Sequence, residues 1–517
     1  MSHGFLRNTT IVGLLTLLSR ISGVIRDMVY LITFGAGPLM DAFLIAFKIP
    51  NFMRRLTAEG AFSQAFVPVV SEYKVQKTHA EVRDLVSGVT GVFGLILFVI
   101  TLVGVIAAPV IVYLFAPGFH DESRFALTVE MFRFTFPYMF FISLVALGSG
   151  VLNSYNRFAV PALNQTLLNL VMIVSAGLVA PYFGNPALVL AVGVFVAGVV
   201  QLVAQFPALH RLGLLPRPRF DRAHEGVRRI ARLMLPGIFG SSVAQVSLLL
   251  DSIIASFFVV GSVTWLYSAD RLVEFPMGVF SIALATVILP GLASHHSEND
   301  QEKFNATLDW ALRLTLTVVV PAAVGLLMLS GPLIATIFGY GAFTQRDILM
   351  CSYALMAYSL GLIGFSMVKV LAPGYYARQD TKTPVKVGLI ALSVNMGFNL
   401  GIVVPALLSG FPIPHVLLAV STGLSALVNS TLLYRGLRRE GIFRPSTAWR
   451  KLLPQIGLAT VAMAAFLWWI SGDWEAWSGW SAARRAVWLG VSVLGGIAVY
   501  FGTMFLAGAR PRDLKHL

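Results

Sequence analysis

Residues 158–210 read FAVPALNQTLLNLVMIVSAGLVAPYFGNPALVLAVGVFVAGVVQLVAQFPALH, without one Asp, Glu, Lys or Arg. The run is interrupted at Pro181-Tyr-Phe-Gly-Asn-Pro186, and clustered Pro and Gly mark turns. Each part exceeds the roughly 18 apolar residues that are needed to cross a bilayer core of about 30 Å. The stretch therefore predicts two membrane-spanning helices joined by a tight turn.

The same pattern fills most of the 517-residue chain, in which 57% of the residues are hydrophobic and 12% are charged. Soluble domains carry roughly 25% charged residues, so this composition excludes a soluble protein of this size. Uncharged runs provide ten helices, since a second run divides at Ser409-Gly-Phe-Pro-Ile-Pro414. Four further apolar segments contain charges, and the prediction is fourteen spans in an all-α integral membrane protein. The uncharged runs are 85–120, 134–156, 158–210, 314–345, 348–368, 387–434, 452–472 and 486–509, and the charged segments are about 8–33, 38–66, 230–258 and 264–293.

Lys and Arg are concentrated in alternate loops, which sets the orientation of the chain. With the N-terminus inside, the cytoplasmic segments hold most of them, above all residues 211–232 and 435–451. Because cytoplasmic loops carry a positive surplus, both termini are predicted in the cytoplasm. The first segment lacks a small-x-small cleavage site and is expected to remain as a span. The predicted outer loops hold Arg124, Arg133, Arg346, Arg484 and Arg485.

The formal net charge is +14, from 38 Lys and Arg against 24 Asp and Glu. In a soluble protein this excess would suggest a nucleic acid partner, but here it reflects topology and no nucleic acid is expected. The single cysteine, Cys351, excludes a disulfide framework and a multi-thiolate metal site. No P-loop, HExxH, CxxC or nucleophile-elbow pattern occurs, so we expect a transporter driven by an ion gradient or the membrane potential. An intramembrane enzyme of lipid-phosphate chemistry is the alternative, because it too would use arginines.

Three pairs of short motifs recur at nearly one offset and predict a duplicated unit of six helices. Both copies would enter the membrane in the same direction, related by a pseudo-two-fold axis along the membrane normal, with the substrate site between them. The predicted layout is an N-terminal lobe 1–210, a cytoplasmic basic linker 211–229, a C-terminal lobe 230–440, and two further helices within 450–510. The motif pairs are Gly35 to Pro50 with Gly261 to Pro276, Phe66-Val-Pro68 with Ile288-Leu-Pro290, and Tyr155 to Pro161 with Tyr376 to Pro384.

Ionisable residues within the predicted spans gather on the first two helices of each repeat. Each costs roughly 2.5–3.5 kcal/mol at bilayer depth, so it usually faces protein or a water-filled cavity. A hydrated cavity between the lobes explains the pattern. The alternative is that the charges pair, as Asp270 with Lys48 or Glu59 with Arg55, and lock the lobes together. The residues are Arg20, Arg26, Asp27, Asp41, Lys48, Arg54, Arg55, Glu59, Asp251, Asp270, Arg271, Glu274 and Lys369.

Arginine predominates among the bases of this set. Its planar fork binds phosphate bidentately and stays ionised when partly buried, so the cavity suits an anionic, phosphate-bearing substrate. Arg54 and Arg55 lie near the inner end, where a snorkelling anchor is the alternative. Pro50 and Pro276 lie mid-helix at matching positions of the repeat, and each frees a carbonyl group and permits a kink. We expect these two prolines to act as hinges.

Five blocks of the sequence are distinctive: Ser19-Arg-Ile-Ser-Gly-Val-Ile-Arg-Asp27, Asp41-Ala-Phe through Lys48-Ile-Pro-Asn51, Arg54-Arg-Leu-Thr-Ala-Glu-Gly-Ala-Phe-Ser-Gln-Ala-Phe-Val-Pro68, Ala269-Asp-Arg-Leu-Val-Glu-Phe-Pro276, and Lys369-Val-Leu-Ala-Pro-Gly-Tyr-Tyr-Ala-Arg-Gln-Asp-Thr-Lys-Thr-Pro384. Together they resemble the MurJ/MviN family of lipid II flippases, within the superfamily of multidrug, oligosaccharidyl-lipid and polysaccharide exporters. The resemblance runs through all fourteen predicted spans, and residues 54–68 are its most specific block.

The resemblance implies a flippase that moves lipid II, an undecaprenyl-pyrophosphate-linked disaccharide peptide, from the cytoplasmic to the periplasmic leaflet of the bacterial inner membrane. Transport would proceed by alternating access and serve peptidoglycan synthesis, and with it cell wall biogenesis and cell shape. The two helices within 450–510 would help to form a groove for the lipid tail. The substrate-binding residues that we expect are Arg20, Arg26, Asp41, Lys48, Arg54, Arg55, Glu59, Asp270, Arg271, Glu274 and Lys369.

The resemblance also suggests a coupling ion, because some family members resemble sodium-coupled carriers. Here Asp251 would be one sodium ligand, with Asn395 and Asn399, which share a helix face at i, i+4. Coupling to the membrane potential is the alternative, and no cofactor is expected. The expected partners are lipid II, membrane lipids and other cell-wall synthesis proteins, and the protein is expected to be a monomer. An exporter of another undecaprenyl-linked glycan would use the same arginine cavity but should lack the block at 54–68.

Overall fold

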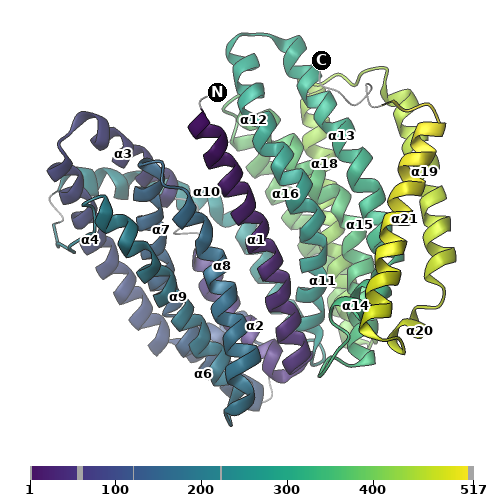
Figure 1. Cartoon of the computed structure of the whole chain (residues 1–517), viewed down its shortest axis with the longest axis horizontal. Coiled ribbons are helices and arrows are strands. Elements are labelled where there is room, and N and C mark those ends of the chain that lie inside the picture. Colours follow the sequence, from purple (N-terminus) through teal and green to yellow (C-terminus); the bar gives the residue numbers. More distant parts are fainter. Residues whose placement is uncertain (1–2, 55–61, 120–121, 222–223, 511–517) are drawn as a thin grey trace. The chain divides into compact units, whose positions relative to one another are not determined.

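The computed structural model describes residues 3–54, 62–119, 122–221 and 224–510, and within them every regular element is a helix (Figure 1). The chain forms two compact units, one ending at Gly261 and one beginning at Ser262. The first contains α1 (His3–Phe34), α2 (Pro38–Arg54), α3 (Phe62–Gln76), α4 (His79–Ile106), α5 (Ala108–Phe115), α6 (Glu122–Thr135), α7 (Tyr138–Ser154), α8 (Ala159–Val174), the π-helix η2 (Ser175–Val179), the 3-10 helix η3 (Ala180–Tyr182), α9 (Pro186–Arg211) and α10 (Glu225–Ser256). The second contains α11 (Ser262–Pro276), the π-helix η4 (Met277–Ser281), α12 (Ile282–Ser297), α13 (Gln301–Met328), α14 (Ser330–Ile337), α15 (Gln345–Tyr376), α16 (Lys382–Phe398), the π-helix η5 (Asn399–Val403), α17 (Val404–Leu408), α18 (Pro414–Arg439), α19 (Trp449–Ser471), α20 (Trp474–Ser478) and α21 (Ala482–Leu506).

Eleven helical segments among the described residues are long and apolar enough to cross a membrane. They include all ten spans predicted from uncharged runs, together with Ser262–Ser297, in which α11, η4 and α12 follow one another. The three other predicted spans are 8–33, 38–66 and 230–258. Segment 8–33 coincides with α1, segment 38–66 with α2 and α3, and segment 230–258 with α10. These helices are not among the eleven. The all-helical membrane class is therefore confirmed, while the number fourteen stays a prediction.

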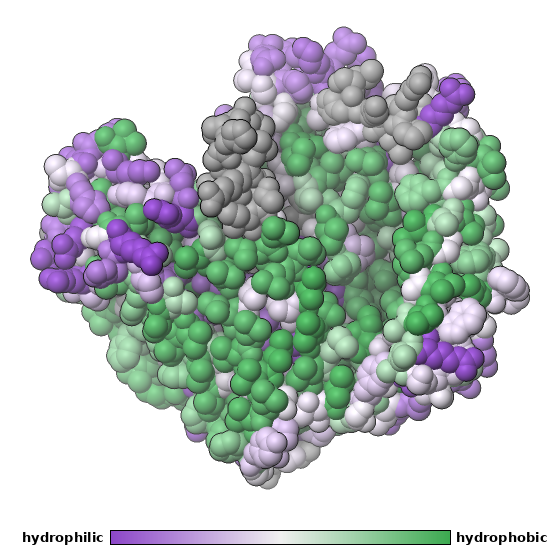
Figure 2. All heavy atoms as spheres, in the orientation of Figure 1, coloured by the Kyte–Doolittle hydropathy of each residue, from purple (hydrophilic) through white to green (hydrophobic). Residues whose placement is uncertain are grey.

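Large apolar side chains remain exposed on the outer faces of these helices. On α4, Phe98, Leu102 and Ile106 are exposed, whereas Leu85 and Val86 are buried in the core of the first unit. In Figure 2 hydrophobic side chains cover the middle of the helices, and hydrophilic side chains gather toward helix ends. In water this surface would be unfavourable by about 25 cal/mol per Å² of apolar area, so its chemistry suits lipid.

The two halves of the chain repeat the same order of helices. α1 and α10 have 32 residues each, α4 and α13 have 28, and α5 and α14 have eight. The members of each of these three pairs begin 222 positions apart. The five-residue π-helices η2 and η5 also correspond. This agreement supports the predicted duplication, and the two-fold relation between the copies stays a prediction.

α10 packs on α3, α4 and α5 within the first unit. Its Val227 and Ile230 enter the core of that unit, and Arg229 donates two hydrogen bonds, of 2.9 and 2.8 Å, to the Glu72 carboxylate of α3. These bonds lower the pKa of Glu72 from its ordinary value. The boundary between packed units, after Gly261, is thus later in the chain than the predicted linker. The assignment of the duplicated lobes to 1–210 and 230–440 stays a prediction.

The described part of the segment between α9 and α10 lies along α4. The backbone N–H groups of Arg217 and Arg219 donate to the hydroxyl and carbonyl oxygens of Ser87, at 3.3 and 3.1 Å. Gly91 lies at the crossing, where a Cβ atom would overlap the backbone of Arg219. α9 and α10 both extend into the predicted linker 211–229. The described residues between the two helices therefore form a strap that is docked on α4, and the assignment of 211–229 as a cytoplasmic linker stays a prediction.

The region 450–510 forms a hairpin of α19 and α21 that is fixed at both ends to the second unit. At one end, Trp449 Nε1 and the Ser446 hydroxyl donate to the buried Asp309 carboxylate of α13, at 2.6 and 2.7 Å. At the other end, the buried Arg485 of α21 donates to the Ala335 carbonyl oxygen in the last turn of α14 at 2.8 Å. A cation favours the negative end of a helix dipole. The hairpin is therefore an integral part of the second unit.

Replacement of Gly91 by alanine should displace the strap from α4. We expect a loss of about 1–3 kcal/mol in the free energy of unfolding, because an added methyl group in a close contact forces backbone shifts. Gly94→Ala on the same helix is the matched control, since its Cβ atom would meet only the Leu144 side chain at 3.9 Å. Unfolding of both purified variants in detergent measures the difference, and equal stability of the two would contradict the close approach.

Candidate functional site

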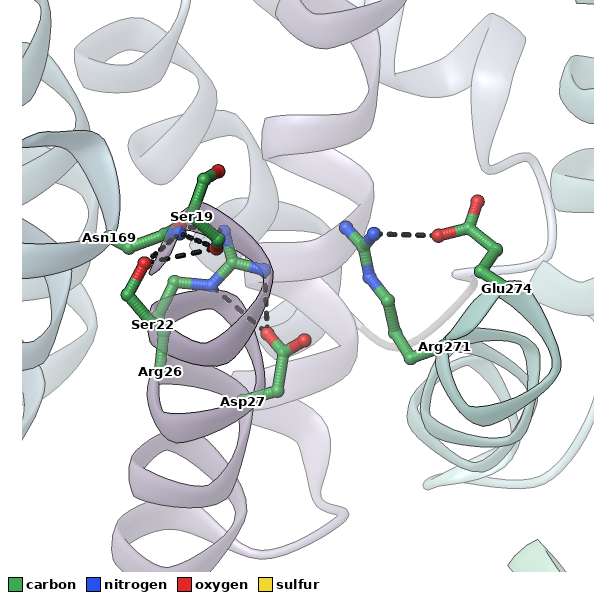
Figure 3. A network of polar contacts seen from close by, with 7 residues as sticks. All are labelled: Ser19, Ser22, Arg26, Asp27, Asn169, Arg271 and Glu274. Atoms are coloured by element: carbon green, nitrogen blue, oxygen red, sulfur yellow. Dashed lines mark hydrogen bonds and ion pairs between the residues drawn. The ribbon is translucent and has the colours of Figure 1, made fainter. Parts of the chain in front are cut away.

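Arg26 lies on α1, which packs against α8, and is 5% exposed. Its Nε and Nη2 donate to one oxygen of Asp27, at 3.0 and 2.6 Å, and its Nη1 donates to Asn169 Oδ1 at 3.0 Å (Figure 3). The guanidinium carbon lies 5.5 Å from the centre of the Tyr30 ring. A buried charge is tolerated when it is both paired and hydrogen-bonded. Arg26 meets both conditions.

Asn169, on α8, completes this network and is 1% exposed. Its Nδ2 donates to the Ser19 carbonyl oxygen at 3.0 Å and to the Ser22 hydroxyl at 2.9 Å. The Ser22 hydroxyl itself donates to the Ser19 carbonyl oxygen at 3.0 Å. Gly23 lies beside this contact and lets the two helices approach closely, as small residues do between membrane helices. One polar network thus joins α1 to α8.

A second arginine group lies on α11. Arg271 Nη1 donates to Glu274 Oε2, one helical turn later, at 2.8 Å (Figure 3). The guanidinium carbon also lies 5.0 Å from the centre of the Tyr267 ring. The side chains of Arg271 and Glu274 are 37% and 38% exposed. This is a local, partly exposed ion pair of the i, i+3 kind.

The two arginines are held with different strength. An exposed ion pair contributes about 0–1 kcal/mol, whereas removing one partner of a buried pair costs about 3–5 kcal/mol. The partly exposed pair of Arg271 with Glu274 is therefore held less strongly than the buried pair of Arg26 with Asp27. Arg26 is fixed by Asp27 and Asn169, so it presents its charge in a set geometry.

In the first unit three other predicted site residues are described with their side chains. Asp41, in the first turn of α2, is buried and accepts a hydrogen bond from the Gly261 backbone N–H at 2.7 Å. Arg20 on α1 and Lys48 on α2 are half-buried. Asp41 therefore binds the backbone of Gly261, the last residue of the first unit. The side chains of Arg20 and Lys48 remain partly exposed.

The remaining predicted residues divide between the second unit and positions outside the described residues. In the second unit Asp270 on α11 is half-buried and Lys369 on α15 is exposed. Arg54 ends α2, and its side chain lies outside the described residues, as do Arg55 and Glu59 entirely. The assignment of all eleven residues to one substrate site stays a prediction.

Both predicted hinge prolines lie within helices. Pro50 is buried inside α2, which continues to Arg54. Pro276 ends α11, and the π-helix η4 follows at once before α12 begins. Prolines and π-helical turns both interrupt regular helical hydrogen bonding and mark kinks. The helix therefore departs from regular geometry at Pro276, and motion about either proline stays a prediction.

Two of the three predicted sodium ligands lie together in the second unit. Asn395 and Asn399 are buried, and Asn399 Nδ2 donates to Asn395 Oδ1 at 3.1 Å. Asn395 Nδ2 donates to the Ser421 hydroxyl of α18 at 3.1 Å. The Asn395 amide oxygen would have to exchange its hydrogen bond for a cation. Asp251 is half-buried on α10, and the described residues contain no cluster of three or more His, Cys, Asp or Glu that could hold a metal ion.

Sequence reasoning that followed charged residues missed Asn169. A signal was present, because Asn164, Gln165, Thr166 and Asn169 place polar side chains in an uncharged and mainly apolar helix. Polar side chains in membrane helices are used for hydrogen bonds between helices. The amides of α8 could therefore have predicted a contact, although not which helix they contact.

Comparisons with known proteins agree over nearly the whole chain. A family model described as lipid II flippase MurJ matches residues 31–487. The probable lipid II flippase MurJ of Haemophilus influenzae is 41% identical over 514 residues, which cover 97% of this chain and 99% of that protein. A solved structure described as lipid II flippase MurJ in an inward closed conformation is 26% identical, with a TM-score of 0.77, over 96% of this chain and 98% of that one.

A more distant structural match concerns the fold alone. An inward-facing multidrug resistance transporter of the MATE family, in the MOP superfamily, is 16% identical, with a TM-score of 0.66. The match covers 82% of this chain and 95% of that one. The helical architecture is therefore similar to that of MOP superfamily transporters.

The two arginines should differ when each is replaced by methionine. Arg26→Met should lower the free energy of unfolding by about 3 kcal/mol, because it leaves the Asp27 carboxylate buried without its cation. Arg271→Met should lower it by less than about 1 kcal/mol. Equilibrium unfolding in detergent measures both, and the double variant Arg26→Met/Asp27→Leu should recover most of the first loss. Equal losses for the two single variants would contradict the difference in burial.

Proposed function

Because the chain belongs to the lipid II flippase MurJ family, we propose that it carries lipid II from the cytoplasmic to the periplasmic leaflet by alternating access. The full-length similarity to a lipid II flippase carries this conclusion. A flippase moves its substrate between leaflets without making or breaking a covalent bond. The protein is accordingly a transporter in peptidoglycan synthesis and cell wall biogenesis, and not an enzyme.

Lipid II joins a charged pyrophosphate and a polar disaccharide peptide to a long apolar tail, and the chain offers groups for each part. Guanidinium groups bind phosphate oxygens bidentately. Arg271, half exposed and paired with Glu274, is suited to exchange that carboxylate for a phosphate. Arg26 is suited to hold a fixed positive charge near α1 and α8. The proposed substrate site comprises Arg20, Arg26, Asp41, Lys48, Arg54, Arg55, Glu59, Asp270, Arg271, Glu274 and Lys369.

We propose that the C-terminal hairpin contacts the undecaprenyl tail. Leu458 and Val461 of α19, and Leu494 and Ile497 of α21, are exposed apolar side chains. A hydrocarbon chain could lie on this surface without leaving an apolar environment. The fixation of the hairpin to α13 and α14 would keep the tail contact with the second unit.

The remaining architecture is part of the same proposal. We propose fourteen spans in the bacterial inner membrane, with both termini in the cytoplasm and two six-helix lobes related by a pseudo-two-fold axis along the membrane normal. Pro50 and Pro276 would be the hinges, and the π-helix η4 after Pro276 supports the second. The protein would act as a monomer, beside other cell-wall synthesis proteins.

Coupling to sodium through Asp251, Asn395 and Asn399 is a separate proposal, and coupling to the membrane potential alone is its alternative. The adjacency of Asn395 and Asn399 supports the sodium site, although their oxygens are neutral and bind a cation more weakly than carboxylates do. No cofactor is proposed.

Depletion of the protein in cells should reduce the lipid II that is exposed on the outer leaflet. Complementation with Arg20→Ala, Arg26→Ala or Arg271→Ala should restore less than about a tenth of the wild-type exposure, since each would remove charge-assisted bonds to pyrophosphate of about 1.5–3 kcal/mol. Arg438→Ala, an exposed position in the last turn of α18, is the control and should complement fully.

Four outcomes, in cells or with purified protein, would count against the proposal. Unimpaired exposure of lipid II on depletion would exclude the flippase function. Full complementation by the three arginine variants would exclude the cavity assignment. Chemical turnover of lipid II by purified protein, without movement between leaflets, would favour an intramembrane enzyme, and selective movement of another undecaprenyl-linked glycan would favour the related exporter.

Sodium coupling is tested in liposomes at a fixed membrane potential. Replacement of sodium by choline should slow lipid II movement several-fold, and Asn395→Ala should abolish that dependence. Asn164→Ala, an amide of the first unit, is the control and should retain the dependence. A rate that is indifferent to sodium would leave the membrane potential as the driving force.

A further inference from the structure

Asn169 is a neutral residue in an uncharged segment, yet among the arginines of the proposed site whose side chains are described it contacts the most deeply buried one, Arg26. Its amide oxygen accepts a hydrogen bond from Arg26 Nη1 at 3.0 Å, across 143 positions of sequence. It comes from α8, whereas Arg26, Asp27, Ser19 and Ser22 all belong to α1 (Figure 3). It is thus the group from a second helix that fixes the guanidinium within this network.

The orientation of the Asn169 amide is determined by its surroundings. Its Nδ2 faces the Ser19 carbonyl oxygen and the Ser22 hydroxyl, at 3.0 and 2.9 Å. The Ser22 hydroxyl donates its hydrogen bond to the Ser19 carbonyl oxygen. Towards Asn169 it can therefore act only as an acceptor. In the flipped orientation, the amide oxygen would face the oxygens of Ser19 and Ser22. The amide N–H groups would face the N–H groups of the Arg26 guanidinium. The amide oxygen must therefore point to Arg26.

Two anchors at different edges of the guanidinium define its plane. Asp27 Oδ1 accepts hydrogen bonds from Nε and Nη2 of Arg26, and Asn169 Oδ1 accepts one from Nη1. A long arginine side chain loses rotamer freedom when it binds a ligand, and a side chain that is already oriented avoids that loss. Asn169 supplies the orientation without adding a negative charge that would compete with an anionic ligand.

We propose that Asn169 is a positioning residue for Arg26 and strengthens pyrophosphate binding through it. This inference rests on the proposed function, in which Arg26 belongs to the substrate site. Asn169 touches the guanidinium, and Arg26 acts on the substrate. Loss of Asn169 should therefore weaken binding only while Arg26 is an arginine.

The test measures lipid II binding to purified full-length variants in detergent. Asn169→Leu, which keeps the volume and removes the amide, should weaken binding about tenfold, because a hydrogen bond to a charged group is lost. In an Arg26→Lys background the same change should weaken binding less than about twofold, since lysine lacks the planar fork that Asn169 orients. The control Asn164→Leu removes an amide of the same helix that bonds to Ser149 instead, and it should leave the affinity unchanged.

A structural role alone would give a different result. If Asn169→Leu and Asn164→Leu lower thermal stability and affinity equally, or if the loss with Asn169→Leu is the same in both arginine and lysine backgrounds, the inference is wrong. Ser22→Ala, which removes one acceptor of the Asn169 amide and favours the helix, serves if Asn169→Leu does not fold, and should weaken binding two- to threefold. Wild-type protein that does not bind lipid II would instead overturn the proposed function, together with every role that depends on it.

Discussion

An ionised side chain buried among apolar helices requires a partner, and the arrangement of α1 and α8 follows from that requirement. Arg26 takes one partner from its own helix, Asp27, and another from α8, Asn169. Ser22 and Gly23 keep the surface of α1 small beside Asn169, so that the two helices can approach. Moving α8 away would break bonds to both Arg26 and Ser22. The polar contact therefore constrains how α1 and α8 pack against each other.

The two arginine groups suggest a division of labour within a transport cycle. A carrier must bind its substrate on one side of the membrane and release it on the other, so not every contact can be rigid. Arg26 is held by buried hydrogen bonds to Asp27 and Asn169, whereas Arg271 is paired with a partly exposed carboxylate one turn away. In the proposed function, Arg26 would define where the pyrophosphate lies, and the exchange between Glu274 and phosphate at Arg271 would permit its release.

The sequence predicted the helical membrane class because an uncharged apolar run long enough to cross a bilayer is typical of a membrane-spanning helix. It also predicted the duplication, which the matched lengths of α4 and α13 support. It did not predict that α10 packs with the first unit, since that depends on burial of Val227 and Ile230 against residues far away in sequence, beside the ion pair of Arg229 with Glu72. The role of Asn169 was not predicted, because the prediction considered ionisable residues only. The Asn169 amide is uncharged, yet its hydrogen bond orients the Arg26 guanidinium.

The strap that follows α9 and the segment that follows α18 are anchored at corresponding positions of two different helices. Ser87 and Asp309 occupy equivalent positions in α4 and α13, two helices of 28 residues. Ser87 accepts hydrogen bonds from the backbone N–H groups of Arg217 and Arg219. Asp309 accepts hydrogen bonds from the side chains of Ser446 and Trp449. In both cases the segment that follows a helix of 26 residues, α9 or α18, is held at corresponding positions of two 28-residue helices, α4 and α13. One of these crossings leads on to α10 and the other to the C-terminal hairpin, so the same kind of anchor serves two different continuations of the chain.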